Sequence, residues 1–160
     1  MISIDGHHLT VEEILKVARN HEKVKISTAG IENINNSYEL KNKIVASTHA
    51  VYGINTGFGI FADKQIANED SSKLSRNLIL SHAVGTGDPF SNEIVRAAML
   101  VRANTLTKGF SGVRLCVVET LLSMLNTNVV PEIPSQGSLG SSGDLAPLSH
   151  LALTFTTDEK

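Results

Sequence analysis

Two glycine-rich segments constrain the fold of this chain more than any other feature of its sequence. Residues 53–59 contain three glycines, and residues 137–143 contain three more. Glycine adopts backbone conformations that helices and strands do not use, so both segments are expected to be irregular loops. Elsewhere, apolar residues recur three or four residues apart, which is the spacing of an amphipathic helix. The sequence therefore predicts a mostly α chain with short β elements and two glycine-rich loops.

The expected elements follow from this spacing and from residues that begin or end helices. Alternating apolar residues predict short strands, and Thr10 with Glu13 forms a capping-box pattern at the start of the first helix. Two prolines make the segment before the second loop extended. The expected elements are strands at 2–4 and 24–26, helices at 10–20, 29–48 and 69–84, a helix from Ser91 to Gly109, a helix beginning at Ser111, the extended segment 129–134, and a last helix capped by Asp144.

The composition limits the kind of protein. A chain of 160 residues, 41% hydrophobic and 19% charged, suits one globular domain over residues 1–160. A formal net charge of −2 gives no electrostatic reason to expect binding to nucleic acid or to an anionic membrane surface. No apolar stretch approaches the roughly 20 residues that span a bilayer, and the N-terminus lacks the pattern of a secretory leader. We therefore expect a cytoplasmic protein.

Cys116 is the only cysteine of the chain. A single cysteine excludes an internal disulfide and a multi-cysteine zinc site. Its apolar neighbours favour a buried structural thiol. No spacing of His, Asp or Glu residues indicates a metal site, so none is expected.

The second glycine-rich loop allows several interpretations. The simplest is a turn. The loop does not match either common phosphate-binding motif. Its glycines at 137, 140 and 143 do not fit the dinucleotide-binding pattern G-x-G-x-x-G, and it lacks the Gly-Lys-Ser/Thr ending of a P-loop. A hydrolase nucleophile elbow needs Gly-x-Ser-x-Gly, and neither Ser141 nor Ser142 is flanked in that way.

A remaining possibility is chemistry of the main chain itself. If the loop bends tightly, the amide nitrogen of Gly143 can attack the carbonyl carbon of Ser141, because glycine has no Cβ to hinder the approach. Loss of two water molecules, one of which takes the Ser142 hydroxyl, gives a five-membered 4-methylidene-imidazol-5-one (MIO). This ring is an electrophile that no ordinary side chain supplies. Amide N–H groups of the helix after Asp144 would favour negative charge on it.

The two loops resemble the two hallmark motifs of the aromatic amino acid ammonia-lyase and aminomutase family. Residues 137–150, GSLGSSGDLAPLSH, resemble the active-site motif of the family. Residues 52–59, YGINTGFG, resemble its other motif. The resemblance covers nearly the whole chain and implies the N-terminal helical domain of the ammonia-lyase fold. One position departs from the family, whose members usually have alanine where this chain has Ser141, a residue whose side chain lies outside the ring closure.

The resemblance also implies roles for individual residues. It assigns Ser141, Ser142 and Gly143 to an autocatalytically formed MIO ring, with no external cofactor. It assigns Tyr52 to the removal of the substrate's β-proton, a role that requires an ionised phenol. Without the resemblance, a tyrosine beside a glycine-rich loop is more commonly a packing residue.

The Ser81–His82 pair indicates the substrate. In this family, two adjacent positions after an Asn-Leu stretch tune the preference for the aromatic ring, and here Asn77-Leu78 precedes Ser81–His82. A Ser-His pair resembles members that act on histidine, whereas phenylalanine- and tyrosine-specific members have Phe-Leu and His-Leu. An imidazole donor at His82 suits a polar ring and would be wasted on benzene. The alternative is a core histidine. His150, inside the long motif, is interpreted as structural support.

The implied reaction eliminates ammonia from L-histidine and gives trans-urocanate. Family members are homotetramers, so the resemblance implies a homo-oligomer. Family members are also longer than this chain, which corresponds to their N-terminal portion. We expect this portion to be inactive alone. One alternative is a tyrosine or phenylalanine ammonia-lyase or an aminomutase of the same family. Another is a non-catalytic helical fragment that serves only association.

Overall fold

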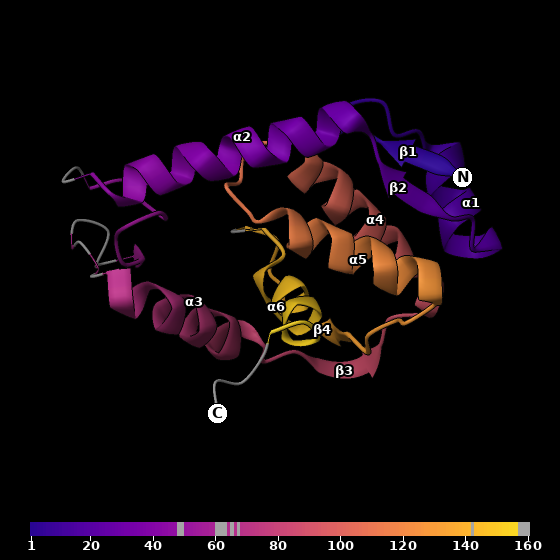
Figure 1. Ribbon diagram of the computed structural model, residues 1–160. Coiled ribbons are helices and arrows are strands. Elements are labelled where there is room, and N and C mark those ends of the chain that lie inside the picture. The colour runs from indigo at the N-terminus through magenta and orange to yellow at the C-terminus, as the bar shows by residue number, and fades with distance from the viewer. Residues whose placement is uncertain (48–49, 60–63, 65, 67, 142, 157–160) are drawn as a thin grey trace. The chain divides into compact units, whose positions relative to one another are not determined.

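The computed structural model describes residues 1–47, 50–59, 64, 66, 68–141 and 143–156. The chain divides into two compact units, one holding Met1–Leu40 and Ser91–Val130 and the other Lys41–Phe90 and Pro131–Lys160. The expectation of a single domain stays a prediction. Helices predominate, which confirms the predicted fold class (Figure 1). The elements in chain order are β1 (Ile2–Ile4), α1 (Val11–Asn20), β2 (Val24–Ile26), α2 (Thr28–Val45), α3 (Asn68–His82), β3 (Thr86–Pro89), α4 (Asn92–Thr107), α5 (Leu115–Thr127), β4 (Pro134–Gln136) and α6 (Leu145–Leu153).

In the first unit, a short strand pair accompanies packed helices. The two predicted strands are confirmed as β1 and β2, which pair in parallel from Ile2 opposite Val24 to Ile4 opposite Ile26. Helix α4 packs against α1 and α5, and α5 also packs against β2; Figure 1 shows α4 and α5 side by side. The core of this unit includes the almost fully buried side chains of Ile4, Val17, Ile34, Met99, Leu100, Val118 and Leu121.

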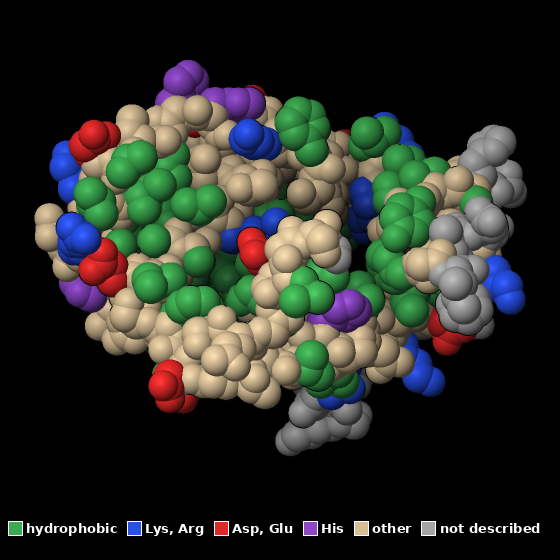
Figure 2. Space-filling model, turned by 180° about the vertical axis from the view of Figure 1, so that it is seen from behind, with side chains coloured by type: hydrophobic (Ala, Val, Ile, Leu, Met, Phe, Trp, Pro, Cys, Tyr) green, Lys and Arg blue, Asp and Glu red, His purple; other side chains and the backbone are tan. Residues whose placement is uncertain are grey.

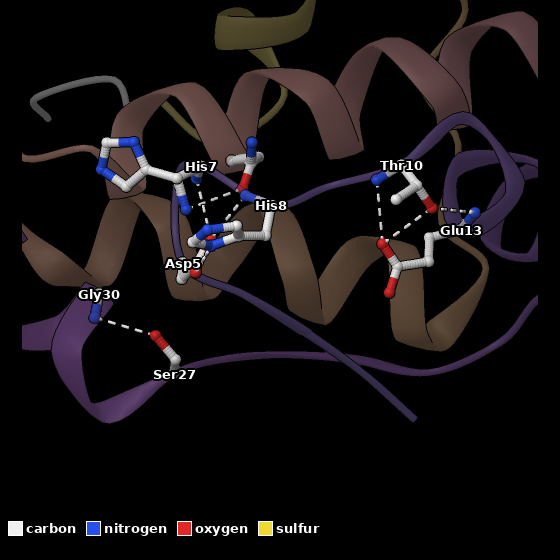
Figure 3. Close-up of polar contacts among 9 residues, drawn as sticks. Asp5, His7, His8, Thr10, Glu13, Ser27 and Gly30 are labelled. Atoms are coloured by element: carbon white, nitrogen blue, oxygen red, sulfur yellow. Dashed lines mark hydrogen bonds and ion pairs between the residues drawn. The ribbon is translucent and has the colours of Figure 1, made fainter.

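The first helix begins with the predicted capping box, drawn in Figure 3. The Thr10 hydroxyl accepts a hydrogen bond from the backbone N–H of Glu13 at 3.3 Å, and the Glu13 carboxylate accepts one from the N–H of Thr10 at 3.0 Å. These contacts satisfy two N–H groups that no helical turn can reach. The helix ends at Asn20, and His21 follows in the left-handed conformation.

Arg96 of α4 is the largest polar side chain in the core and is only 1% exposed. Its guanidinium donates to the carbonyl of Val17 at 2.8 Å and to the carbonyl of Leu125 at 3.1 Å. A third bond, also 3.1 Å, reaches the side-chain oxygen of Asn128. Both carbonyls lie near the C-terminal end of a helix, where partial negative charge collects. Arg96 therefore links the C-terminal ends of α1 and α5 by hydrogen bonds. Burial lowers the pKa of its guanidinium.

The predicted start of the fifth helix is wrong. Helix α5 begins at Leu115 rather than at Ser111. Gly112 lies in the left-handed region with φ of 62°, and its N–H donates to the hydroxyl of Ser37 at 2.8 Å instead of to a helical turn. The bond to α2 thus holds this segment outside the helix.

One expectation about burial in the first unit is wrong, and other apolar side chains are also exposed there. Cys116 is exposed rather than buried. At 100° per residue it lies on the face of α5 opposite the buried Leu125, although its neighbours in sequence are apolar. Likewise, Val11 and Leu15 of α1 are 67% and 38% exposed, while the buried face of that helix carries Val17.

The second unit combines α3, α6 and a pair of short strands. Helix α3 packs against α6, and β3 pairs antiparallel with β4, with Thr86 opposite Gln136 and Pro89 opposite Pro134. The sequence did not predict this strand pair. The N–H of Phe90 continues the pairing with a 2.9 Å bond to the carbonyl of Ile133.

The helix boundaries elsewhere are close to the predicted ones. The helix predicted at 29–48 is α2, which spans Thr28–Val45; residue 48 lies outside the described residues. The helix predicted at 69–84 is α3, which spans Asn68–His82. Ser91 and Asp144 occupy the predicted N-cap positions of α4 and α6, but neither side chain makes a capping hydrogen bond.

Several large apolar side chains lie at the surface of the chain. Figure 2 shows hydrophobic side chains in separate patches on the face seen there. Phe110 is 86% exposed and Leu139 is 97% exposed, and Ile94 and Val101 of α4 are about half exposed. Within the described ranges, no helix is long and apolar enough to cross a membrane, and no group of three His, Cys, Asp or Glu side chains could hold a metal ion.

Candidate active site

The first glycine-rich loop follows α2 and carries Tyr52. It is built around Asn55, which is 7% exposed. The side-chain oxygen of Asn55 accepts from the N–H of Val51 at 2.7 Å, and the N–H of Asn55 donates to the carbonyl of Val51 at 3.3 Å. Tyr52 lies in the turn closed by these bonds, is 63% exposed, and contacts the ring of Phe58 edge-on at a centroid distance of 6.0 Å. The phenol is therefore open to a small molecule.

Backbone hydrogen bonds close the other end of this loop. The N–H of Gly57 donates to the carbonyl of Lys64, and the N–H of Ile66 donates to the carbonyl of Asn55, both at 3.0 Å. Thr56 is 3% exposed, and its hydroxyl donates to the carbonyl of Gly57 at 3.0 Å. The part of the loop that is described is thus held by its own polar groups. Residues 60–63, directly after this segment, lie outside the described residues.

His82 is the last residue of α3 and is partly buried. Its Nδ1 lies 2.8 Å from the carbonyl oxygen of Leu78 and 3.0 Å from the hydroxyl of Ser81, which itself donates to that carbonyl at 2.9 Å. A carbonyl oxygen can only accept, so the proton of the neutral imidazole lies on Nδ1. The other nitrogen, Nε2, is then an acceptor rather than the donor expected from the sequence.

The second glycine-rich loop, between β4 and α6, doubles back on itself. Both Gly140 and Ser141 form a bridge with Gly143. The Ser138 hydroxyl accepts from the N–H of Gly140 at 3.2 Å and donates to the carbonyl of Gly143 at 3.4 Å, so it spans the turn. Ser142 lies outside the described residues.

The residues of this loop fit the self-formed ring expected from the resemblance. Ring closure requires the nitrogen of Gly143 to approach the carbonyl of Ser141, which lies two residues before it in the same loop. Ser141 itself is exposed, which leaves room for its hydroxyl. A Cβ added at Gly143 would meet no described atom within 4 Å, so its φ of 77°, rather than crowding, requires glycine at this position.

Helix α6 begins directly after the loop, with Asp144 at its N-cap position and Leu145 as its first residue. The first N–H groups of a helix have no partner within it, and this end carries partial positive charge. The side chain of Asp144 does not cap these groups. The start of α6 can therefore stabilise negative charge that develops beside the loop.

A close approach joins the end of α3 to the base of the second loop. The N–H of Gly85 donates to Nε2 of His150 in α6 at 2.9 Å. A Cβ at Gly85 would lie 3.0 Å from that nitrogen, and a Cβ at Gly137 would lie 3.1 Å from the Cα of Gly85. His82 precedes Gly85 by three residues. The structure thus brings together the segment that carries His82 and the base of the loop that carries Ser141 and Gly143.

Tyr52 is not joined to these two segments by a hydrogen bond among the residues that the structure describes. His150, interpreted from the sequence as structural support, accepts a hydrogen bond from the N–H of Gly85. The partner of that bond, 65 residues away, could not be found from the sequence, because no local pattern relates the two residues. The buried Asn55 and the spanning hydroxyl of Ser138 were also missed. Their only signal is a polar residue inside a glycine-rich loop.

Proteins with similar sequences are lyases. The chain is 54% identical over 154 residues to the histidine ammonia-lyase of Caldanaerobacter subterraneus subsp. tengcongensis, covering 96% of this chain and 30% of that protein. It is 52% identical over 155 residues to the histidine ammonia-lyase of Bacillus subtilis, covering 97% of this chain and 30% of that protein. The chain thus spans about 30% of the length of the curated relatives that it matches.

Solved structures with the same fold come from several related enzymes. The ergothionase of Treponema denticola, an ergothioneine-degrading enzyme, has a TM-score of 0.92 at 32% identity, over 96% of this chain and 31% of that chain. The tyrosine aminomutase of Streptomyces globisporus has a TM-score of 0.88 at 38% identity, over 94% and 28%. The histidine ammonia-lyase of Trypanosoma cruzi has a TM-score of 0.85 at 38% identity, over 95% and 28%. The family model for aromatic amino acid lyases matches residues 9–160, and this chain belongs to that family.

Proposed function

We propose that the whole protein is a histidine ammonia-lyase, which eliminates ammonia from L-histidine and releases trans-urocanate. The observation that carries this proposal is the Ser81–His82 pair at the end of α3, where Nδ1 of His82 is bonded to the Leu78 carbonyl and Nε2 stays available as an acceptor. Curated relatives at 52% and 54% identity that are named histidine ammonia-lyases support it.

The electrophile of this reaction comes from Ser141, Ser142 and Gly143. Attack of the Gly143 nitrogen on the Ser141 carbonyl carbon, with loss of two water molecules, closes the MIO ring without any external cofactor. Once formed, the ring supplies an electron-accepting methylene that turns the substrate amine into a leaving group. The hydroxyl of Ser138 supports ring closure, because its bonds to Gly140 and Gly143 hold together the two residues between which the serines lie.

His82 recognises the ring of the substrate. The imidazole of L-histidine has an N–H group that can donate to Nε2 of His82, whereas a phenyl ring has none. With a phenyl ring bound, this partly buried acceptor would lose its bond with water and gain no partner. A polar site of this kind discriminates strongly against an analogue that lacks the matching group.

Tyr52 removes the β-proton of the substrate through its phenolate oxygen. Its exposed side chain and its place in the hallmark motif at residues 52–59 support this role. The uncapped start of α6 favours the negative charge that develops during elimination. We further propose a homo-oligomer, a tetramer, as the active form, located in the cytoplasm.

A second candidate is a tyrosine or phenylalanine ammonia-lyase or an aminomutase. The observation in its favour is the 38% identity to the tyrosine aminomutase of Streptomyces globisporus. Parallel assays of the whole protein with L-histidine, L-tyrosine and L-phenylalanine separate these possibilities. Formation of urocanate, followed by its ultraviolet absorbance, supports the histidine reaction. Turnover of only tyrosine or phenylalanine contradicts it.

The ring itself is tested by mass spectrometry. We expect the peptide that contains residues 141–143 to be lighter than its sequence by two water molecules. Ser142→Ala should restore the unmodified mass and abolish nearly all turnover, because the alanine cannot form the methylene. Ser135→Ala is the matched control on the exposed strand β4 and should keep both the ring and the rate. An intact serine in a fully active enzyme contradicts the proposal, and an unmodified, inactive whole protein supports the non-catalytic association fragment.

A further inference from the structure

We propose that His150 is a positioning residue, which fixes the distance between His82 and the ring-forming loop and thereby sets the preference for histidine over phenylalanine. This inference rests on the proposed function. It concerns a residue that touches neither the reacting atoms nor the substrate's ring, and it starts from the hydrogen bond between Nε2 of His150 and the N–H of Gly85.

The bond defines the chemical state of the His150 ring. A backbone N–H donates to Nε2 at 2.9 Å, so Nε2 carries a lone pair and the neutral ring carries its proton on Nδ1. The contact is partly buried. A side chain that replaces His150 must therefore offer an acceptor at the same place, or it leaves the partly buried Gly85 N–H without this partner.

The two ends of the bond lead to two different parts of the site. On one side, His150 belongs to α6, a rigid helix that begins two residues after Gly143. On the other side, Gly85 is only three residues after His82. A shift of Gly85 relative to α6 therefore changes the separation between the recognition group and the loop that forms the electrophile.

Strand β4 also holds the segment around Gly85, independently of His150. A Cβ at Gly85 would lie 3.1 Å from Pro134 and 3.2 Å from the carbonyl oxygen of Gln136, so the backbone is already packed against β4. The strand pair β3–β4 holds the same segments by backbone bonds that do not involve His150. Loss of the His150 bond is thus expected to loosen the position of Gly85 while the unit stays folded.

A matched pair of variants tests the role. Glutamine can place an amide oxygen near the position of Nε2, whereas asparagine is one methylene shorter and cannot. In the whole protein, we expect His150→Gln to keep the ratio of kcat/KM for L-histidine over L-phenylalanine within about twofold. His150→Asn and His150→Phe should lower that ratio about five- to twentyfold, mainly through a higher KM for L-histidine, as expected from the loss of one hydrogen bond. The two-water mass deficit at 141–143 should persist in all three.

The result that overturns the proposal is a His150→Asn protein with the selectivity and KM of the unsubstituted protein. An equal loss in His150→Asn and His150→Gln also overturns it, because the acceptor would then not matter. Hydrogen exchange of the peptide that covers residues 83–90 is a readout that does not depend on activity. Faster exchange in His150→Asn than in His150→Gln supports the bond even if the unsubstituted protein fails to convert L-histidine, a result that would count only against the proposed function.

Discussion

Arg96 carries the most consequential polar network among the residues of the first unit. At the end of α1, the N–H of His21 bonds to the carbonyl of Lys16, so the helix does not use this group for the carbonyl of Val17. The guanidinium of Arg96 satisfies that carbonyl instead. A buried carbonyl left without a donor costs about 1–3 kcal/mol.

We therefore expect Arg96→Met to lower the free energy of unfolding of the chain by about 2 kcal/mol, because methionine fills the volume but donates no hydrogen bond. Arg96→Lys should recover only part of the loss, since an ammonium group lacks the planar fork that reaches both helix ends. Urea denaturation followed by circular dichroism measures the difference. Arg102→Met is the matched control, because Arg102 lies exposed on the same helix. Equal midpoints for the two methionine variants would contradict the role of Arg96.

A second residue-scale prediction concerns the turn after β1, drawn in Figure 3. The Asp5 carboxylate lies 2.5 Å from Nδ1 of His8 and accepts from the backbone N–H groups of His7 and His8 at 2.8 and 3.0 Å. The side-chain bond to His8 is the main cause that lowers the pKa of Asp5, and the same bond to Asp5 raises the pKa of His8 above 6.5.

The sign of each shift gives a pH window for this pair. The raised pKa of His8 means that its contribution is fully present below 6.5 and is lost as pH rises through the folded value. The lowered pKa of Asp5 means that its contribution is present above 3.8 and is lost as pH falls through the folded value. An NMR titration of the His8 ring should show the raised pKa, and Asp5→Asn should return it to the ordinary value. An unchanged titration in that variant would show that the carboxylate is not the cause.

At the scale of elements, the capping box is the clearest link between sequence and structure. Replacing Thr10 by alanine removes the hydroxyl that accepts from the N–H of Glu13, and the loss of such a cap costs about 1 kcal/mol. We expect Thr10→Ala to lower the free energy of unfolding of the chain, measured by urea denaturation, by this amount. Thr10→Ser keeps the hydroxyl and serves as the control. If serine and alanine destabilise equally, the lost methyl group rather than the hydroxyl is responsible.

Elements that local chemistry determines were predictable, and elements that distant contacts determine were not. Apolar and polar residues alternate in the strands at 2–4 and 24–26. The capping box at Thr10 and Glu13 marks the start of the first helix. In contrast, β3 reads Thr-Gly-Asp-Pro, is exposed throughout, and contains residues that strands disfavour. Only its pairing with β4 makes it a strand. The start of α5 was misplaced for the same reason, because a bond from Gly112 to Ser37 in another helix decides it.

The candidate site was predictable to a similar extent. The loops and the residues Tyr52, Ser141 and Gly143 could be named from two long motifs, because each motif is continuous in sequence. His82 could be named from the Ser-His pair that follows Asn77-Leu78. Their arrangement could not, since the contacts that join His82 to the second loop run through Gly85 and His150, which are far apart in sequence and carry no shared pattern.

At the scale of the whole molecule, the candidate residues are concentrated in one of the two units. Tyr52, His82, Ser141 and Gly143 all belong to the unit formed by Lys41–Phe90 and Pro131–Lys160. The other unit contributes the buried core around Arg96 and the capped first helix. Substitutions at Arg96 or Thr10 are therefore expected to change stability without changing substrate preference, whereas substitutions at His150 should do the reverse.

The last prediction concerns residues 1–160 as an isolated chain. These residues span about 30% of the length of the relatives, and Tyr52 is 63% exposed in them, so we expect them to orient a bound amino acid poorly. Loss of orientation by a distance of about 1 Å already costs about a hundredfold in rate. We therefore expect the isolated chain to form urocanate at least about a hundredfold more slowly, per chain, than the histidine ammonia-lyase of Bacillus subtilis under the same conditions. The absorbance of urocanate gives the rate, and the mass of the peptide holding residues 141–143 shows whether the ring has formed. Comparable rates would mean that these residues alone complete the site.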